Sequence, residues 1–292
     1  MGVTPAIAVT GAGGFIGRKA LPRLAAAFGD VVGIDLVPRP SGWEGRWLQG
    51  GVERLREVDT PFVAVHLAWN MRRSDAAAQA AALEDFRKML AVPGRVGLVG
   101  LGSAEEYGNE EGCLAEDRAP GAALSPYGRA KHEALRAAEA AGGRFIWLRP
   151  FIAYGEGQGG DMAIPYALRC AREGRVAEFS EGSQFRDFVH ADDVAAGIVA
   201  AVRAVLRLDA AVCRVCNLGC GKPVRLRDVL ERIAAGSGRE RLFRFGVRPM
   251  RTGEPRVQYA DAAAAKETLG WEAEIPWEEG IDRLCRNAEE KA

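Results

Sequence analysis

Short runs of apolar residues recur through the first half of the chain and alternate with stretches of helical periodicity. The strand-like runs are Ala6–Thr10, Val31–Asp35, Phe62–Leu67, Val96–Gly100 and Phe145–Leu148, with a further short candidate at residues 46–49. Between them, the alanine-rich segment Ala76–Leu90 is typical of a helix. Alternating strands and helices predict a parallel sheet with helices on both faces.

The pattern changes after Pro150, where glycine, proline and charged residues interrupt the chain as far as Asp187. Helices are expected again at Asp192–Leu206 and Leu226–Ala235. We therefore predict an α/β fold: a Rossmann-type, doubly wound parallel sheet with a smaller C-terminal substrate lobe. Residues 1–150, with about 187–216 returning to them, would form the dinucleotide-binding domain. The lobe would comprise about 151–186 and 217–292, and a cleft between the two would lie at the carboxyl ends of the strands.

A glycine-rich stretch, VTGAGGFIG at residues 9–17, lies between the first predicted strand and the first helix. The spacing G-x-G-x-x-G fails at Ile16, whereas Gly11, Gly14 and Gly17 satisfy G-x-x-G-x-x-G. Glycines let the backbone approach a ligand, and the start of a helix offers N–H groups to a pyrophosphate. A glycine turn alone also occurs in unrelated α/β domains, but its place between strand and helix favours dinucleotide binding.

The second predicted strand ends at Asp35, about 20 residues beyond the glycines, where an acid typically accepts the hydroxyls of an adenosine ribose. Its negative charge should repel the 2′-phosphate of NADP, so the sequence predicts NAD as the preferred cofactor. Arg39 follows closely and could reach such a phosphate, which keeps NADP as the less favoured alternative.

The segment SPYGRAKHEAL supplies a candidate catalytic pair, Tyr127 and Lys131, on one face of a helix that Ser125 can cap. The ordinary pKa of a tyrosine phenol is about 10, so the phenol is protonated at neutral pH. A nearby ammonium, together with the positive nicotinamide ring of an oxidised cofactor, favours the phenolate and would make Tyr127 a base at neutral pH. Y-x-x-x-K also arises by chance on helix surfaces, and it gains weight here because the glycine turn is in the same chain.

A serine loop, LVGLGSAEEYG, lies upstream of this pair. Ser103 falls at the carboxyl end of a predicted strand, where its hydroxyl could bond a substrate oxygen beside Tyr127 or simply cap the loop. Glu105 and Glu106 follow. Adjacent acids are usually solvated, and we expect Glu106 to be so.

The composition narrows the choice of partners. Lys plus Arg and Asp plus Glu each number 39, so the net charge is zero, which argues against a nucleic-acid partner. No apolar run is long enough to cross a membrane and no secretory signal is recognised, so we expect no membrane partner and a cytoplasmic location. Cys213, Cys216 and Cys220 cluster, but residues three apart on a strand point to opposite faces. We expect buried thiols and no metal.

Together these segments resemble the extended short-chain dehydrogenases/reductases, in particular the NAD-dependent epimerase/dehydratase family that acts on sugar nucleotides. The resemblance covers nearly the whole chain and rests on TGAGGFIG, HLA at residues 66–68, GSAEEYG, SPYGRAK, RDFVHADDVA at residues 186–195, NLGCGKPVRLRDV and LGWEAEIPWEEGI. The GSAEEYG form is most similar to reductases that convert a 4-keto-6-deoxy GDP-hexose to a 6-deoxyhexose.

The resemblance implies a role for each matching residue. Ser103, Tyr127 and Lys131 match the catalytic triad. Glu105 matches the base that the family's 4,6-dehydratases use at C5 of the sugar, although Ala104 replaces the aspartate or serine that many of them carry. The cofactor-binding set is Gly11, Gly14, Phe15, Ile16, Gly17, Asp35, Leu67, Ala68 and Lys131.

On the substrate side, Arg186 and Arg251 match contacts to the diphosphate, and Glu254 matches a contact to the nucleotide ribose. Arginine suits phosphate because its planar fork donates two parallel hydrogen bonds. The chain departs from the family at Ile152, where an asparagine commonly touches the substrate. It also departs at Trp69, where a small residue is usual and where the indole would narrow the nicotinamide side of the cleft.

Several functions remain open at this point. A sugar-nucleotide 4-epimerase or 4-keto-reductase, working on a nucleotide-sugar substrate as a homodimer, fits best. A 4,6-dehydratase with Glu105 as base is one alternative, and a dehydrogenase acting on a non-sugar alcohol or ketone is another, which Ile152 favours. A non-catalytic dinucleotide sensor fits least, because both Tyr127 and Lys131 are present.

Overall fold

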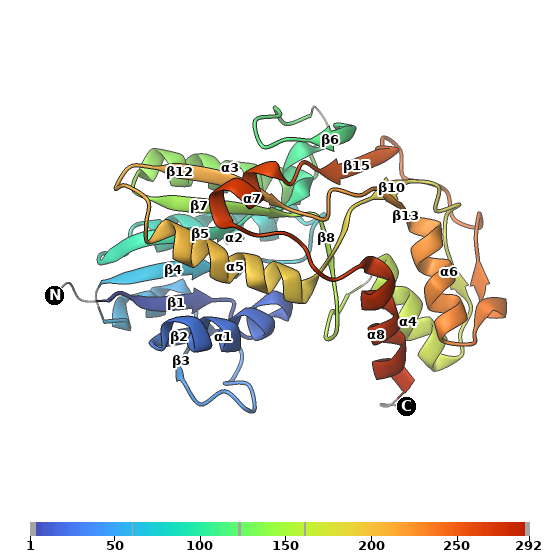
Figure 1. Ribbon diagram of the computed structural model, residues 1–292, viewed down its shortest axis with the longest axis horizontal. Helices are drawn as coiled ribbons and strands as arrows, with labels where there is room; N and C mark the ends of the chain where they lie inside the picture. Colours follow the sequence, from blue (N-terminus) through green and yellow to red (C-terminus); the bar gives the residue numbers. More distant parts are fainter. Residues whose placement is uncertain (1–3, 60, 122–123, 161, 290–292) are drawn as a thin grey trace.

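The computed structural model describes residues 4–59, 61–121, 124–160 and 162–289. A seven-stranded sheet flanked by helices makes up the larger part of the molecule, and a smaller helical lobe lies beyond one end of the sheet (Figure 1). In the described part of the chain, no helix is both long and apolar enough to span a bilayer.

All seven strands of the large sheet are parallel, in the order β12-β7-β5-β4-β1-β2-β3. Their bounds are β1 Ala6–Thr10, β2 Val31–Asp35, β3 Arg46–Gln49, β4 Phe62–His66, β5 Arg95–Leu101, β7 Phe145–Pro150 and β12 Cys213–Leu218. All the strands predicted from apolar runs are therefore present, and the predicted fold class is confirmed. The chain order reverses between β1 and β4, and doubly wound sheets bind ligands outside the carboxyl ends of such strands.

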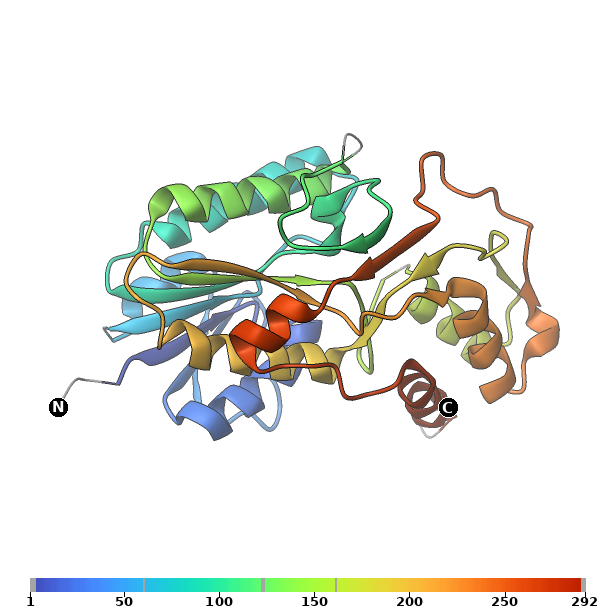
Figure 2. The same cartoon turned by 45° about the horizontal axis from the view of Figure 1, so that its top comes forward.

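Helices cover both faces of this sheet because successive strand residues point to opposite sides. Ile7 and Val9 of β1 pack into one core, and Ala8 packs into the other. The first core lies under α1 Phe15–Phe28, α5 Ala191–Val205 and α7 Ala263–Leu269. The second lies under α2 Ala76–Leu90 and α3 Pro126–Ala141, and Figure 2 shows the two helix layers on either side of the strands.

The smaller lobe has its own apolar core, which includes Ile164, Val229, Ile233, Ile281 and Leu284. These residues lie on the helices α4 Ala163–Glu173, α6 Leu226–Gly236 and α8 Trp277–Glu289. Short strands complete the chain's sheets: β8 Ile152–Tyr154 with β11 Phe188–His190, β9 Ala177–Glu178 with β14 Phe243–Arg244, and a four-stranded sheet of β13 Val224–Arg225, β10 Phe185–Arg186, β15 Val257–Ala260 and β6 Gly112–Leu114. The 3-10 helices are η1 Val52–Glu57, η2 Ala104–Tyr107 and η3 Glu240–Leu242.

The chain passes between the two parts more than once. β12 joins the large sheet and α5 packs against α1. Ala265 of α7 and the nearby Trp271 also belong to the first core of that sheet, although they come from the C-terminal part of the sequence. The division of the chain into two domains at the boundaries given above stays a prediction.

Candidate active site

The glycine turn places bare backbone at the carboxyl end of β1. Gly14 is the N-cap of α1, no side chain caps this helix, and its first turn holds no acid. The N–H groups of Phe15 and Ile16 at the helix start therefore suit a phosphate anion. Gly11 has a φ of +72°, and a Cβ there would lie 2.5 Å from the backbone nitrogen of Ala68, so no other residue fits.

Two neighbouring segments complete this edge of the sheet. Leu67 and Ala68 follow β4 directly, and the N–H of Leu67 donates to the carbonyl oxygen of Thr10 at 3.0 Å. A Cβ at Gly17 would collide with the carbonyl oxygen of Gly11, so the helix packs closely on the turn. The predicted cofactor residues around β1, α1 and β4 thus lie together.

Asp35 stands at the end of β2, beside the turn. Its Oδ2 accepts a hydrogen bond from the N–H of Gly13 at 2.9 Å, and its Oδ1 accepts one from the N–H of Val37 at 3.2 Å. A carboxylate has about four acceptor positions, so capacity for ribose hydroxyls remains. A bare helix start with an acid at the next strand's end fits a dinucleotide whose adenosine ribose lacks a 2′-phosphate.

The candidate catalytic residues converge on the opposite side of the same edge. Tyr127 and Lys131 are buried near the start of α3, which Ser125 caps by accepting a hydrogen bond from the N–H of Gly128 at 3.0 Å. Ser103 caps η2, and its Oγ accepts a hydrogen bond from the N–H of Glu105 at 3.1 Å. Ser103 thus caps η2, and its hydroxyl is close enough to Tyr127 to favour the phenolate.

The pKa of Tyr127 differs from the sequence-based expectation. Burial raises it to about 12, although the positive charge of Arg73 and the hydrogen bond with Ser103 lower it in part. Desolvation of the phenolate therefore outweighs the nearby cation in the protein chain by itself. The lowered pKa that we expected is therefore not found in the protein chain alone.

Lys131 is held by two contacts that orient its ammonium. Its Nζ donates to the carbonyl oxygen of Leu101 at 2.5 Å and lies 3.7 Å from the centre of the Trp69 ring. Burial lowers the pKa of Lys131 to about 7. Trp69 is fixed in turn, because its Nε1 donates to the side-chain oxygen of Gln79 at 2.8 Å. The Trp69 indole, which stands where the family has a small residue, therefore packs against the Lys131 ammonium.

Glu105 does not point freely into this site. One of its carboxylate oxygens pairs with the guanidinium of Arg73, and the other accepts a hydrogen bond from the hydroxyl of Ser125 at 2.7 Å. The guanidinium carbon of Arg73 also lies 4.9 Å from the centre of the Tyr127 ring. Arg73, which the sequence analysis did not single out, thus links two of the predicted site residues.

The expectation that Glu106 is solvated is wrong. Glu106 is 1% exposed, and its carboxylate pairs with Arg149 of β7 at 3.0 Å. It also accepts hydrogen bonds from the N–H of Ser103 at 2.9 Å and from the Trp147 indole at 3.0 Å. These partners replace the water that an ionised acid loses on burial, so Glu106 is a structural support of the serine loop.

The profile of the NAD dependent epimerase/dehydratase family matches residues 7–216, which include the glycine turn, Asp35 and the Tyr127–Lys131 pair. The chain belongs to this family. It is an NAD-dependent enzyme of the extended short-chain dehydrogenase/reductase type. The family resemblance stated from the sequence is thereby confirmed.

Several known proteins are similar to this chain over almost its whole length. A bifunctional UDP-glucose 4-epimerase and UDP-xylose 4-epimerase of Arabidopsis thaliana is 26% identical, over 96% of this chain and 93% of its own. The structure of MoeE5 in complex with UDP-glucuronic acid and NAD is 27% identical, with a TM-score of 0.86 over 98% of this chain and 100% of MoeE5. A UDP-glucuronic acid 4-epimerase from Bacillus cereus, 23% identical, has the same fold with a TM-score of 0.84 over 98% of this chain and 100% of its own.

The residues predicted to contact the substrate are only partly brought together. Arg186 on β10 is nearly buried, and its guanidinium pairs with Glu254 at 3.0 Å. The same Glu254 oxygen accepts a hydrogen bond from the amide nitrogen of Gln184 at 3.0 Å. Arg251 is exposed on the loop that precedes Glu254. Ile152, at the family's usual asparagine position, is half-buried on β8.

The cysteine cluster is spread along β12 and the turn that follows it. Cys216 is buried and Cys220 is partly exposed, but Cys213 is exposed, so the expectation of three buried thiols holds only in part. Burial raises the pKa of the Cys216 and Cys220 thiols to about 12. Both thiols are therefore protonated at neutral pH.

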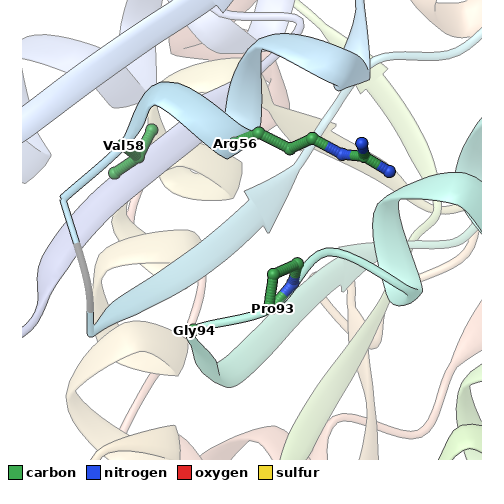
Figure 3. A pocket seen from close by; sticks show the side chains of 4 residues that line it. All are labelled: Arg56, Val58, Pro93 and Gly94. Carbon is green, nitrogen blue, oxygen red and sulfur yellow. The ribbon is translucent and has the colours of Figure 1, made fainter.

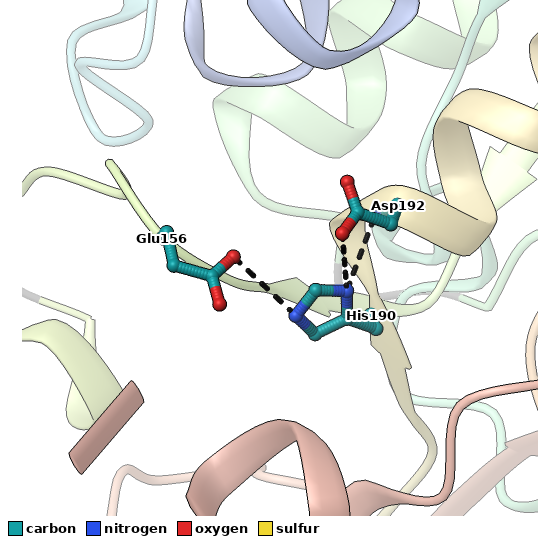
Figure 4. A group of neighbouring side chains, drawn as sticks. All are labelled: Glu156, His190 and Asp192. Atoms are coloured by element: carbon teal, nitrogen blue, oxygen red, sulfur yellow. Dashed lines mark hydrogen bonds and ion pairs between the residues drawn. The ribbon is translucent and has the colours of Figure 1, made fainter. Parts of the chain in front are cut away.

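Within the described residues, one group of side chains, Glu156, His190 and Asp192, has the spacing of a cation site, with ligand atoms within 4.8 Å (Figure 4). Lys19 already supplies a cation there, because its Nζ lies 3.0 Å from Glu156 and 3.2 Å from Asp192. The Nδ1 of His190 accepts from the N–H of Asp192 at 3.2 Å, so a neutral imidazole carries its proton on the Nε2 that faces Glu156. This is an ion-pair cluster rather than a metal centre.

A surface hollow lined by Arg56, Val58, Pro93 and Gly94 lies elsewhere on the enzyme (Figure 3). Pro93 and Gly94 directly precede β5, while Arg56 and Val58 lie at the end of η1 and just beyond it, before β4, so the hollow is at the amino ends of the strands. The glycine turn, the serine loop and Tyr127 are all at or beyond the carboxyl ends. The hollow is therefore not part of the candidate active site.

Proposed function

We propose that this enzyme is a 4-epimerase of a nucleoside-diphosphate sugar, with UDP-hexoses or UDP-hexuronic acids as its substrate class. The names of its relatives support the class: UDP-sugar 4-epimerases recur among them, and MoeE5 binds UDP-glucuronic acid with NAD. The convergence of Ser103, Tyr127 and Lys131 supports a proton transfer at one sugar hydroxyl.

In this proposal each site residue has a chemical task. Tyr127 takes the proton from the 4-hydroxyl and returns it, while the Ser103 hydroxyl holds the same oxygen. NAD, when bound, supplies reversible oxidation of that carbon. Lys131 orients the nicotinamide ribose and adds positive charge near Tyr127. The adenosine half is held by the set described above, namely Gly11, Gly14, Phe15, Ile16, Gly17, Asp35, Leu67 and Ala68.

The observation that carries the choice of epimerase is the engagement of Glu105. A 4,6-dehydratase needs a base directed at C5, whereas the carboxylate of Glu105 is directed at the Arg73 guanidinium and the Ser125 hydroxyl. A 4-epimerase needs no such base, because one tyrosine serves oxidation and reduction alike. Ala104 favours the same choice.

On the substrate side, Arg186 and Arg251 would bind the diphosphate, and Glu254 would accept the ribose hydroxyls. Arg186 is suited to this because its surroundings are largely dry, which strengthens a charge-assisted hydrogen bond. The exposed Arg251 would have to move towards the ligand. We also expect a homodimer in the cytoplasm, and sedimentation of the purified protein tests the dimer.

The test is to incubate the purified enzyme with UDP-glucose and with UDP-glucuronic acid and to identify the C4 epimer by chromatography. Tyr127→Phe should abolish conversion and leave NAD affinity nearly unchanged. Tyr259→Phe on β15 is the matched control and should convert normally. Conversion by Tyr127→Phe at more than a few per cent of the wild-type rate would contradict the proposed chemistry.

The 4-keto-reductase is the second candidate, and the resemblance of GSAEEYG to reductase loops favours it. A reductase consumes one reduced cofactor for each product molecule, whereas an epimerase regenerates its cofactor. Stoichiometric loss of NADH absorbance with a 4-keto-6-deoxy sugar nucleotide, without conversion of UDP-hexoses, would therefore select the reductase.

A further inference from the structure

Arg73 is the nearer of two cationic side chains that lie over the Tyr127 ring. Its guanidinium carbon is 4.9 Å from the ring centre, whereas the Nζ of Lys131 is 5.8 Å from it. The main chain joins the two residues as well, because the N–H of Tyr127 donates to the carbonyl oxygen of Arg73 at 3.2 Å. Arg73 is therefore tied to the start of α3, where the tyrosine lies.

The loop that carries Arg73 is braced from below. Gln79 of α2 is 1% exposed, and its amide nitrogen donates to the carbonyl oxygens of Asn70 and Arg72, each at 2.9 Å. Asp75 caps α2 by accepting from the N–H of Ala78 at 3.0 Å. These bonds fix the backbone on both sides of Arg73, and the ion pair with Glu105 orients its guanidinium.

We propose that Arg73 is the positioning residue whose permanent charge activates Tyr127, and that Glu105 holds this charge in place and tempers it. The inference rests on the proposed role of Tyr127 as the acid and base. In this proposal Glu105 acts on Tyr127 through Arg73 and does not transfer a proton at the sugar.

Arg73 suits this task better than Lys131 does. An arginine stays protonated at every physiological pH, whereas burial lowers the pKa of Lys131 to about 7. Near neutral pH the lysine is thus neutral part of the time. Its ammonium is also directed towards the Leu101 carbonyl oxygen and the Trp69 ring.

The charges that face Tyr127 come from three elements. Arg73 lies on the loop before α2, Glu105 and Glu106 lie on η2, and Lys131 lies on α3 itself. Arg73 lowers the pKa of Tyr127, whereas Glu105 and Glu106 raise it. Glu106 is held in a buried pair with Arg149. The Arg73–Glu105 pair is therefore the part of the local electrostatic field whose charges can be changed to shift the pKa of Tyr127.

The inference predicts opposite effects for the two partners of one ion pair. Arg73→Met removes a positive charge and should raise the pKa of Tyr127 by about one unit, the size expected for a partly screened charge at this range. Glu105→Gln keeps the shape but removes the negative charge, so it should lower that pKa. Arg73→Lys should lie between Arg73→Met and the wild type. A change that acted only through packing would not reverse its sign.

The direct measurement is a pH titration of Tyr127 by NMR in protein made with isotope-labelled tyrosine, with NAD bound and no sugar present. The chain has 5 tyrosines, so the Tyr127→Phe variant assigns the signal. Arg72→Met is the matched control, since Arg72 is an exposed neighbour on the same loop that pairs with Asp75. It should leave the titration unchanged.

Equal Tyr127 titrations in the wild type and Arg73→Met, or shifts of the same sign in Arg73→Met and Glu105→Gln, would overturn the inference. This readout needs no turnover, so it stands apart from the proposed epimerase activity, which the Tyr127→Phe conversion assay decides. In the pH profile of turnover at saturating UDP-sugar, the acid limb should move with the titration at nearly constant KM. A rise in KM with an unmoved limb would make Arg73 a substrate contact instead.

Discussion

Two arginine–glutamate pairs lie near Tyr127, and they are built from acids that are adjacent in the sequence. The Glu106–Arg149 pair lies beneath the serine loop, with its side chains 0% and 5% exposed. The Glu105–Arg73 pair lies beside Tyr127, with its side chains 34% and 35% exposed. Identical chemistry therefore operates in two different surroundings one residue apart.

The difference shows why one pair is structural and the other is available for tuning. A buried ion pair costs much desolvation, and it is stable only when every remaining donor and acceptor is used. Arg149 fulfils this condition by also donating to Tyr107 at 3.0 Å and to the carbonyl oxygen of Glu116 at 3.1 Å. A partly exposed ion pair contributes little to the free energy of unfolding. The charges of the Glu105–Arg73 pair can therefore serve to shift the pKa of Tyr127 without much effect on stability.

The largest expected effect is on the buried pair. Glu106→Gln leaves Arg149 charged and without its counterion, and should lower the free energy of unfolding by about 3–5 kcal/mol. Urea unfolding followed by circular dichroism measures this loss. A loss below about 1 kcal/mol would place the buried pair in the same class as the exposed one.

The next effect concerns Lys131, on which the two pairs act with opposite sign: Glu106 raises its pKa and Arg73 lowers it. The pKa of Lys131 is about 7 in the folded chain against 10.5 for an ordinary lysine. Between these values the unfolded chain binds a proton that the folded chain does not, so stability should rise with pH across this window. Below this pH window Lys131 is charged in both the folded and the unfolded chain, and the full free-energy cost of burying its charge lowers the stability.

Lys131→Met removes this titration. Relative to the wild type, the variant should gain a few kcal/mol at acidic pH, at roughly 1.4 kcal/mol per pKa unit, and the gain should vanish as pH approaches the ordinary value. Unfolding midpoints measured over a pH series without NAD check it. A stability difference that does not vary with pH would contradict the lowered pKa.

A smaller effect is expected for the stability of the exposed pair. Arg73→Met should change the free energy of unfolding by less than about 1 kcal/mol, although it shifts the titration of Tyr127. The same urea experiment tests this, with Arg72→Met as the reference. A loss as large as that of Glu106→Gln would show that the comparison between the two pairs is mistaken.

The smallest effect is expected for turnover in Glu105→Gln at the optimal pH. An epimerase should lose less than about threefold in turnover rate. At the optimal pH Tyr127 is already in the protonation state that the reaction needs, so a small shift of its pKa changes the rate little. The assay is run in heavy water. Deuterium that appears at C5 of the sugar in the wild type and disappears in Glu105→Gln would instead identify a dehydratase.

Local patterns in the sequence were enough to predict the large sheet and where many of the candidate site residues lie in it. Short continuous apolar runs predicted the strands, the glycine turn followed β1, and Asp35 came at the end of β2 as the spacing required. Tyr127 and Lys131 share a helix face because residues four apart always do. The burial of Glu106 was also foreseeable, since Ser103 and Glu106 have the spacing of a capping box, which the structure contains.

Tertiary structure alone decided the electrostatics of the site. Arg73 and Glu105 are 32 residues apart, and their pairing depends on a loop that Gln79 braces from another helix. The same holds for the raised pKa of Tyr127 and the lowered pKa of Lys131, because burial depends on which elements pack above a side chain. A sequence determines which short-range hydrogen bonds and apolar faces exist, whereas desolvation and charge pairing are sums over neighbours that only the folded chain brings together.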